Sequence, residues 1–203
     1  MDTDRFGQRV HRDERRKELK LSDNFVAVYS GSIGLWTSAS MIMTLFKKIQ
    51  EVAPESRLLV LTQTRAITAL KPFEKLGSDV KILHLKPDAL SEWICIADMA
   101  LLPRKECIVN HVAFPVKFGE YLAAGLPVLV TRSVTALADI TEANRLGEVV
   151  GDVDDPHIFK AVKRLISHQR QHSTDGEAYA ESELSVRKIG RKWLEQYQDV
   201  FWT

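Results

Sequence analysis

The chain has 203 residues, 45% of them hydrophobic, which suits one large domain or a domain with a small appendage. Its 28 Lys and Arg residues nearly balance its 27 Asp and Glu residues, so the composition disfavours a polyanion and predicts no nucleic-acid partner. The two cysteines, Cys95 and Cys107, belong to no CxxC pair, so we expect neither a disulfide framework nor a zinc site.

Targeting signals are the next feature. The first ten residues lack the apolar core of a signal peptide, and no apolar run reaches the roughly 18 residues that a membrane span needs. We therefore expect a cytoplasmic location. The segments 9–20, 160–170 and 187–192 are rich in basic residues. They are either solvated helix faces or patches that contact anionic lipid at the inner face of the membrane.

Short β-branched runs alternate with longer amphipathic segments in the first half of the chain. Phe25–Ser30 is predicted to be a strand, followed by a turn at 31–34 and a helix from about Thr37 to Val52, with Thr37 or Ser38 as its N-cap. The next expected elements are a strand at 58–62, a helix at 65–76 that Pro72 kinks or splits, a strand at 80–85 and a helix from 87 to about 96.

The same alternation continues in the second half. The expected elements are a strand at 99–102, a helix at 115–124 that stops at Gly125, a strand at 128–131, a helix at 136–145, a strand at 148–150 and a helix after Pro156. The segment 169–176 is polar and rich in turn residues, so we expect a loop there. One or two helices should then run to Trp202, with apolar anchors at Trp193, Leu194, Tyr197, Val200 and Phe201.

Strands separated by helices of ten or more residues need crossover connections. Such connections produce a parallel sheet with both faces covered. The sequence therefore predicts a doubly wound, Rossmann-like α/β fold. We divide the chain into an N-terminal segment and helix at 1–22, a main domain at 23–170 and C-terminal helices at 171–203.

Ligands of such sheets bind outside the carboxyl ends of the strands. This rule points to the segments 31–34, 62–65 and 103–115, and to the loop after Thr131. In the first of these, Gly31, Ser32 and Gly34 form a G-x-x-G turn that can bring backbone N–H groups close to an anion. The pattern is neither the dinucleotide fingerprint nor a P-loop, so a tight strand-to-helix turn without a ligand remains the alternative.

The segment 110–130 holds a second candidate. After Pro115, the side chains of Lys117, Glu120 and Tyr121 share one helix face. A carboxylate there can accept hydrogen bonds from the two vicinal hydroxyls of a ribose, and a nearby ammonium can balance phosphate charge. The alternative is an exposed Lys–Glu pair that contributes roughly a few tenths of a kcal/mol.

Four segments together resemble one known family. They are Asp2–Phe6 (DTDRF), 25–36 (FVAVYSGSIGLW), Ala97–Pro103 (ADMALLP) and the pattern P-x-K-F-x-E-Y-L-A-A-G-L-P-V-L, which starts at Pro115. In this order they resemble the donor-binding C-terminal lobe of GT-B glycosyltransferases, especially family 4, the glycosyl transferases group 1. The resemblance covers most of residues 2–153. It implies that 1–22 is an interdomain linker and helix, and that 23–170 binds a nucleotide sugar.

The resemblance also assigns roles to residues. Glu120 matches the second glutamate of the family's E-x7-E motif, which holds the ribose, whereas Val112 stands where the first glutamate would be. In branches that lack this first glutamate, Arg104, Asn110 and Lys117 look like the polar replacements. The expected donor-binding residues are therefore Gly31, Ser32, Gly34, Asn110, Glu120 and Tyr121.

The family's basic residues near the first helix, which brace the diphosphate, have no match between Gly31 and Phe46. Arg104 and Lys117 are therefore our candidates for stabilising the leaving group, with Arg65 and Arg132 as weaker ones. The DVD triplet at 152–154 precedes Pro156 and is better interpreted as a helix cap than as a metal site. We expect no metal and no cofactor, and a UDP- or GDP-type sugar as the substrate.

The implied activity is transfer of a sugar from a nucleoside-diphosphate sugar to a glycan or a lipid-linked acceptor, with retention by analogy. This chain begins where the interdomain linker would lie, so we expect the acceptor-binding N-terminal lobe to be missing or to be a separate polypeptide. The alternatives are a nucleotide-sugar epimerase of the same fold and a non-catalytic α/β interaction module. The further catalytic acids and histidine-bearing donor loop of such an epimerase are not found in the sequence.

Overall fold

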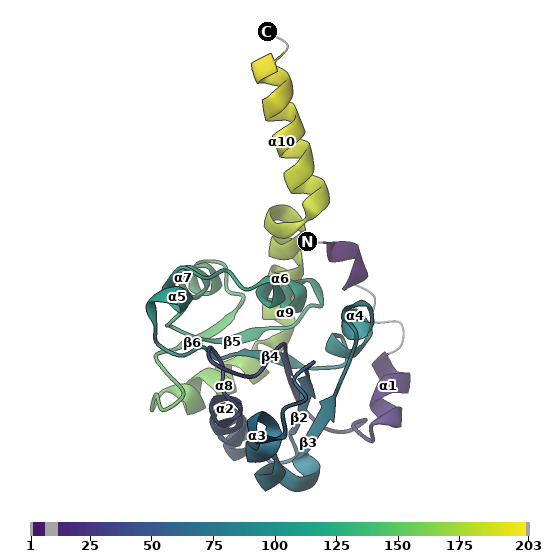
Figure 1. Ribbon diagram of the computed structural model, residues 1–203, viewed down its shortest axis with the longest axis vertical. Helices are drawn as coiled ribbons and strands as arrows, with labels where there is room; N and C mark the ends of the chain where they lie inside the picture. The colour runs from purple at the N-terminus through teal and green to yellow at the C-terminus, as the bar shows by residue number, and fades with distance from the viewer. Residues whose placement is uncertain (1, 7–11, 202–203) are drawn as a thin grey trace.

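The computed structural model describes residues 2–6 and 12–201 (Figure 1). Its centre is a six-stranded sheet in the order β3-β2-β1-β4-β5-β6, in which all neighbouring strands are parallel. The strands are β1 (Val26–Ser30), β2 (Arg57–Leu61), β3 (Val80–Leu83), β4 (Met99–Leu102), β5 (Val128–Thr131) and β6 (Gly147–Val150). The predicted doubly wound, Rossmann-like fold is confirmed.

The strand order reverses at β1. The chain moves outward through β2 to β3, then returns to place β4 on the other side of β1, so that Ala27 lies between Leu58 and Met99. At such a switch point the two adjacent loops leave the sheet in opposite directions and open a crevice at the carboxyl ends of the strands. This crevice lies after β1 and β4.

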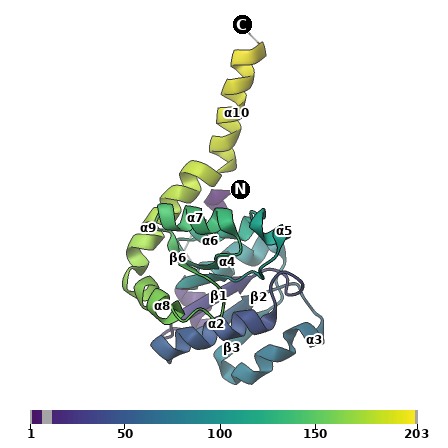
Figure 2. The same cartoon turned by 90° about the vertical axis from the view of Figure 1, so that its left-hand side faces the viewer.

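Helices cover both faces of the sheet, and every residue of β1 is buried, as expected for a parallel sheet. One face carries α2 (Ala39–Val52), α8 (Ile158–Ser167) and the 3₁₀ segment η2 (Lys71–Asp79). The other carries α4 (Leu90–Ile94), α6 (Val116–Ala123) and α7 (Thr135–Ala143) (Figure 2). The helix α1 (Arg12–Glu18) lies beside α4 (Figure 1). The remaining short elements are η1 (Thr3–Arg5), α3 (Ile67–Leu70), η3 (Pro87–Ala89), α5 (Ile108–His111) and η4 (Ala180–Leu184).

Helix ends follow the local sequence signals. Ser38 is the N-cap of α2, and its hydroxyl accepts a hydrogen bond from the Met41 N–H at 3.3 Å, which decides between the two predicted caps. The helix α6 ends before Gly125, whose φ of 66° and N–H bond to the Leu122 carbonyl form a left-handed C-terminal cap.

Two helical regions differ from the prediction. The helix expected at 65–76 is divided into α3 and η2, and Pro72 stands at the beginning of η2, where its missing N–H costs no hydrogen bond. The helix expected from 87 to 96 begins as the 3₁₀ turn η3 and continues as α4.

The prediction of a loop at 169–176 is wrong, because this segment forms the helix α9 (Gln169–Tyr179). Although the segment is polar, His172 and Gly176 of α9 and Ala180 at the start of η4 are buried on one side of the helix, and α9 packs against α6. A Cβ on Gly176 would lie 3.3 Å from Leu122 Cδ2, so the glycine permits close approach of the two helices. Tertiary packing, rather than intrinsic propensity, stabilises this helix.

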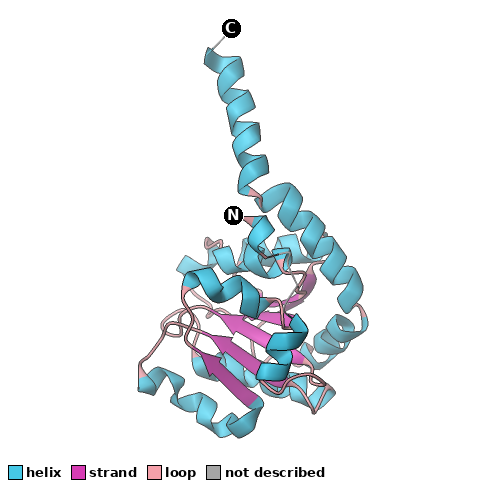
Figure 3. Ribbon diagram, turned by 90° about the vertical axis from the view of Figure 1, so that its right-hand side faces the viewer, coloured by secondary structure: helices cyan, strands magenta, loops and turns pink. Residues whose placement is uncertain are grey.

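The last helix, α10 (Val186–Phe201), projects away from the sheet (Figures 1 and 3). Its apolar residues Trp193, Leu194 and Tyr197 are each more than half exposed. The side chains of the predicted anchors Val200 and Phe201, together with Trp202 and residues 9–11 of the basic N-terminal segment, lie outside the described part of the chain. Within that part, no helix is both long and apolar enough to cross a bilayer.

Candidate nucleotide site at the switch point

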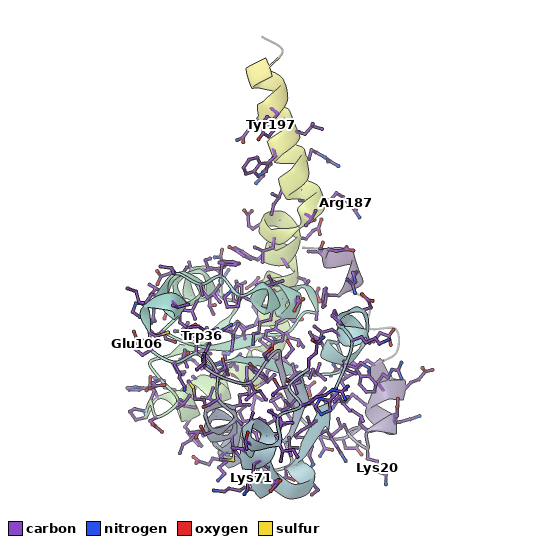
Figure 4. All side chains as sticks on the ribbon, in the orientation of Figure 1. Lys20, Trp36, Lys71, Glu106, Arg187 and Tyr197 are labelled. Atoms are coloured by element: carbon purple, nitrogen blue, oxygen red, sulfur yellow. The ribbon has the colours of Figure 1, made fainter. Side chains whose placement is uncertain are left out.

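The site begins where the loops after β1 and β4 meet. The Thr37 hydroxyl donates to the Pro103 carbonyl at 2.8 Å, and the Lys105 N–H donates to the Trp36 carbonyl at 3.0 Å. Figure 4 shows Trp36 and Glu106 on the same side of the molecule. These bonds fix the two walls of the crevice against each other at the place where the topology predicts a ligand.

The first wall is the turn at Gly31. This residue has a φ of 116°, which a residue with a side chain rarely adopts, and its N–H bonds the Leu61 carbonyl of β2 at 2.8 Å. A Cβ here would lie 3.0 Å from the ammonium of Lys117. Glycine is therefore required both by the backbone conformation and by the cation packed against it.

Lys117, in the first turn of α6, extends its ammonium beneath this turn. The Nζ atom donates to the Ser30 carbonyl at 2.8 Å and lies 4.1 Å from the centroid of the Tyr29 ring. Burial, together with the charge of Arg104, lowers the pKa of Lys117 to about 7, while the charge of Glu120 opposes the shift. Among the described residues, no carboxylate lies within ion-pair distance of this ammonium.

Glu120 lies one turn further along α6 and is half-buried. Burial raises the pKa of its carboxyl group, while the charges of Lys117 and Arg5 lower it. Sequence reasoning missed Arg5 as a site residue. It belongs to η1, and its guanidinium also lies 3.6 Å from the Asp88 carboxylate on η3. In the sequence, the segment around Arg5 has a signal only in the family resemblance. Packing of η1 against α6 brings it near Glu120.

Tyr121, predicted to bind the donor, lies in the core instead. It is fully buried, and its hydroxyl oxygen accepts hydrogen bonds from the Ser30 N–H at 2.7 Å and from the Ser30 hydroxyl at 3.0 Å. Burial raises its pKa. The structure thus gives Tyr121 no surface for a ligand; it holds the end of β1 in place.

The second wall is the connection between β4 and α6. It contains Arg104, which directly follows the end of β4, and Asn110 of the short helix α5. The backbone of Arg104 is held by the end of β5: its N–H donates to the Thr131 hydroxyl at 2.9 Å, and the Ser133 hydroxyl donates to its carbonyl at 2.7 Å. The buried Asn110 donates to the Lys105 carbonyl at 2.8 Å. The Arg104 Nε and the Asn110 Oδ1 are buried and have no partner among the described residues. Buried polar atoms usually have a partner, so a water molecule or a polar ligand would complete their hydrogen bonding.

A hollow of about 140 Å³ adjoins the glycine turn on the β2 side. Its lining is largely apolar and consists of Gly31, Ser32, Leu61, Thr62, Gln63, Leu85, Lys86, Pro87 and Leu90. Gly34, in contrast, is exposed and does not line the hollow.

The two weaker cation candidates lie outside this constellation. Arg132 is exposed and pairs with Glu142 and, at 3.6 Å, with Asp139. Arg65 does not line the first hollow but an adjoining one, formed with His84 and with Gln63, Leu85 and Lys86, which the two hollows share. The described residues contain no group of three His, Cys, Asp or Glu side chains suited to hold a metal ion.

The comparisons with known proteins concern the fold and the family. The family model described as glycosyl transferases group 1 matches residues 24–168. No curated protein matches the chain. Among solved structures, Alr3699/HepE from Anabaena, in complex with UDP and glucose, is 15% identical, with a TM-score of 0.77 over 98% of this chain and 55% of its own.

Two further structures show the same fold. A glycosyltransferase from Rickettsia africae is 15% identical, with a TM-score of 0.73 over 98% of this chain and 55% of its own. The C-terminal domain of LpcC, a glycosyl transferase group 1 family protein from Francisella tularensis, is 15% identical, with a TM-score of 0.67 over 92% of this chain and 99% of its own. This chain thus spans about half the length of the larger proteins. Because the family model covers well over half of its residues, the chain belongs to the glycosyl transferases group 1 family.

Proposed function

We propose that this chain is the donor-binding half of a glycosyltransferase that moves a sugar from a nucleoside-diphosphate sugar to a glycan or a lipid-linked acceptor. The observation that carries the proposal is the ammonium of Lys117, which is packed against the Gly31 turn with no carboxylate partner among the described residues. A buried cation without a counterion is costly in the empty site and is stabilised when an anion binds.

The proposed donor lies along the crevice. The base enters the apolar hollow beside Ser32, the ribose diol binds the carboxylate of Glu120, and the diphosphate lies against Gly31, near Lys117 and Arg104. HepE was solved with UDP and glucose, which makes UDP the first nucleotide to test here. A GDP-type donor is the alternative.

The chemistry of this half is electrostatic. In the transfer, the bond between the sugar's anomeric carbon and the phosphate oxygen breaks, and the same carbon bonds the acceptor oxygen, whose proton is removed by a base. Negative charge grows on the departing diphosphate. Lys117, Arg104 and the N–H groups of the glycine turn stabilise it, and they do so efficiently because the fold holds them in place before the reaction.

We further propose that an acceptor-binding lobe completes the enzyme. The exposed apolar residues Trp193, Leu194 and Tyr197 on α10 are suited to pack against such a lobe. Alone, the chain should bind the donor and transfer the sugar poorly, because catalysis needs both substrates in register. We place the protein in the cytoplasm, with the basic residues of α10 as a peripheral contact to anionic lipid.

The test is a thermal-shift panel of UDP, GDP, ADP and their sugars without added metal. We expect one diphosphate to raise the melting temperature, and Glu120→Ala to abolish the rise. The matched control is Glu51→Ala, because Lys48 and Glu51 form an exposed i, i+3 pair on α2 with the spacing of Lys117 and Glu120 but away from the crevice. If no nucleotide shifts the wild-type chain, the proposal is wrong.

A further inference from the structure

Tyr29, the penultimate residue of β1, contacts both the glycine turn and the side chain of Lys117. Its side chain is fully buried, and its hydroxyl donates to the Ser32 carbonyl at 2.7 Å. The face of its ring lies 4.1 Å from the ammonium of Lys117. The same residue therefore contacts both the backbone of the turn and the cation beneath it.

The hydrogen bonds of the turn single out one donor. The Gly31 N–H is bonded to the Leu61 carbonyl at 2.8 Å, and the Ile33 N–H to the Thr64 hydroxyl at 3.0 Å. Between them, the Ser32 N–H has no acceptor among the described residues. Ser32 is exposed and lines the hollow, so a ligand can reach this group.

The direction of that N–H is set by its neighbours. The peptide before it is held on both sides, at the Ser30 carbonyl by Lys117 and at the Gly31 N–H by β2. The peptide after it is held at the Ser32 carbonyl by Tyr29 and at the Ile33 N–H by Thr64. The free N–H thus lies between two anchored peptide planes, which is the preorganisation that anion binding by backbone groups requires.

We propose that Tyr29 is a positioning residue of the nucleotide site, whose hydroxyl holds the Ser32 carbonyl so that the Ser32 N–H is directed at a phosphate oxygen of the bound nucleotide. The inference rests on the proposed function and adds a residue to it. Burial raises the pKa of Tyr29 to about 12, so the hydroxyl keeps its proton and remains a donor. The aromatic ring has the separate task of supporting Lys117.

The variant Tyr29→Phe separates these two tasks. It preserves the ring beneath Lys117 and the packing of the core, and it removes the hydroxyl, with its bond to the Ser32 carbonyl and its interaction with the Thr37 side chain. The matched control is Tyr179→Phe, which removes the hydroxyl of a partly buried tyrosine on the other face of the sheet.

The experiment is calorimetric titration of the full chain with UDP, and with GDP and ADP beside it, at constant pH. We expect Tyr29→Phe to weaken UDP binding about tenfold, which corresponds to about 1.4 kcal/mol, and Tyr179→Phe to leave it unchanged. Uridine, which carries no phosphate, should bind both variants as it binds the wild type. Equal loss of uridine and UDP affinity, or no loss of either, would overturn the role of Tyr29.

A measurement on the wild-type chain protects the test against misfolding of the variant. The amide proton of Ser32 should shift downfield in the NMR spectrum when UDP is added, and uridine should not move it. A Ser32 amide that UDP leaves unmoved would overturn the inference. If the wild-type chain binds none of the three nucleotides, the proposed function itself is wrong. If it binds UDP without these effects, only the proposed role of Tyr29 is wrong.

Discussion

Buried cations lie at both ends of the sheet, but those at the amino ends of the strands have a carboxylate partner and those at the carboxyl ends do not, within the described part of the chain. At the amino ends of β1 and β4, Arg16 is almost fully buried and donates to the Ile96 carbonyl at 2.7 Å and to the Asp98 carboxylate at 3.2 Å. Arg12 donates to the same carboxylate at 2.6 Å, and so does the Val26 N–H at 2.7 Å. At the carboxyl ends, Lys117 and Arg104 have no carboxylate partner in the described part of the chain.

This difference in partners suggests different roles for the two groups of cations, one structural and one in ligand binding. The two cations at the amino end share the Asp98 carboxylate and donate to backbone carbonyls, so they have acceptors within the chain and removal of the carboxylate would be costly. The cations at the carboxyl end repel each other and lie beside a backbone N–H without an acceptor among the described residues, and the charge of Glu120 offsets only part of this cost, so a bound anion would lower it further. Charge compensation therefore distinguishes the two ends better than the number of basic residues does.

The largest effect should come from breaking the compensated end. Asp98→Ala leaves Arg12 and Arg16 without their shared carboxylate, and we expect the free energy of unfolding to fall by about 3–5 kcal/mol. Urea denaturation measures it, with Asp139→Ala, an exposed carboxylate, as the control. A loss below about 1 kcal/mol would show that the network contributes little.

The second prediction sharpens the contrast at the uncompensated end. In the folded chain the pKa of Lys117 is about 7, against an ordinary value of 10.5. Between these values the unfolded chain binds more protons, so stability should increase with pH there, by up to about 1.4 kcal/mol per unit. Below pH 7 both states are protonated and the penalty is complete.

The measurement is urea denaturation of the wild type and of Lys117→Met at several pH values from 6 to 10. Because Met carries no charge, the slope in this window should be present in the wild type and absent from the variant. Parallel curves for the two proteins would contradict the depressed pKa.

The smallest effect concerns Arg5. Its charge helps to keep the Glu120 carboxylate ionised, together with that of Lys117, against the burial that raises the pKa of Glu120. In Arg5→Gln the pKa should rise further, so UDP affinity should fall earlier as the pH decreases from 7.5 to 5.5. The loss should be smallest near pH 7.5, where the carboxylate is most ionised, and should grow as the pH decreases.

Calorimetric titration with UDP over this pH range checks the effect. Arg15→Gln is the control, because Arg15 pairs with Glu18 and Glu92 and lies over Trp93, away from the crevice. If the two variants show the same pH profile as the wild type, Arg5 has no influence on Glu120.

Much of the fold could be read from the sequence. Hydrophobic runs at 26–30, 58–61, 99–102 and 128–131 became strands, and the separating helices required a parallel sheet. The carboxyl ends of parallel strands share one edge, which predicted that the candidate residues would lie close together, and Gly31 and Lys117 do meet there. The loop expected at 169–176 failed because its helix is stabilised by contacts with α6 that leave no periodic apolar signal.

The sequence by itself determined the alternation of elements, the C-terminal cap at Gly125 and the family to which the chain belongs, since these depend on neighbouring residues and their spacing. Only the structure decided that Ser38 rather than Thr37 is the N-cap, that Tyr121 lies inside, that the charge of Arg5 acts on Glu120 and that Tyr29 donates to Ser32. The physical reason is that burial and electrostatic coupling depend on distances between residues far apart in the chain, which no local pattern contains.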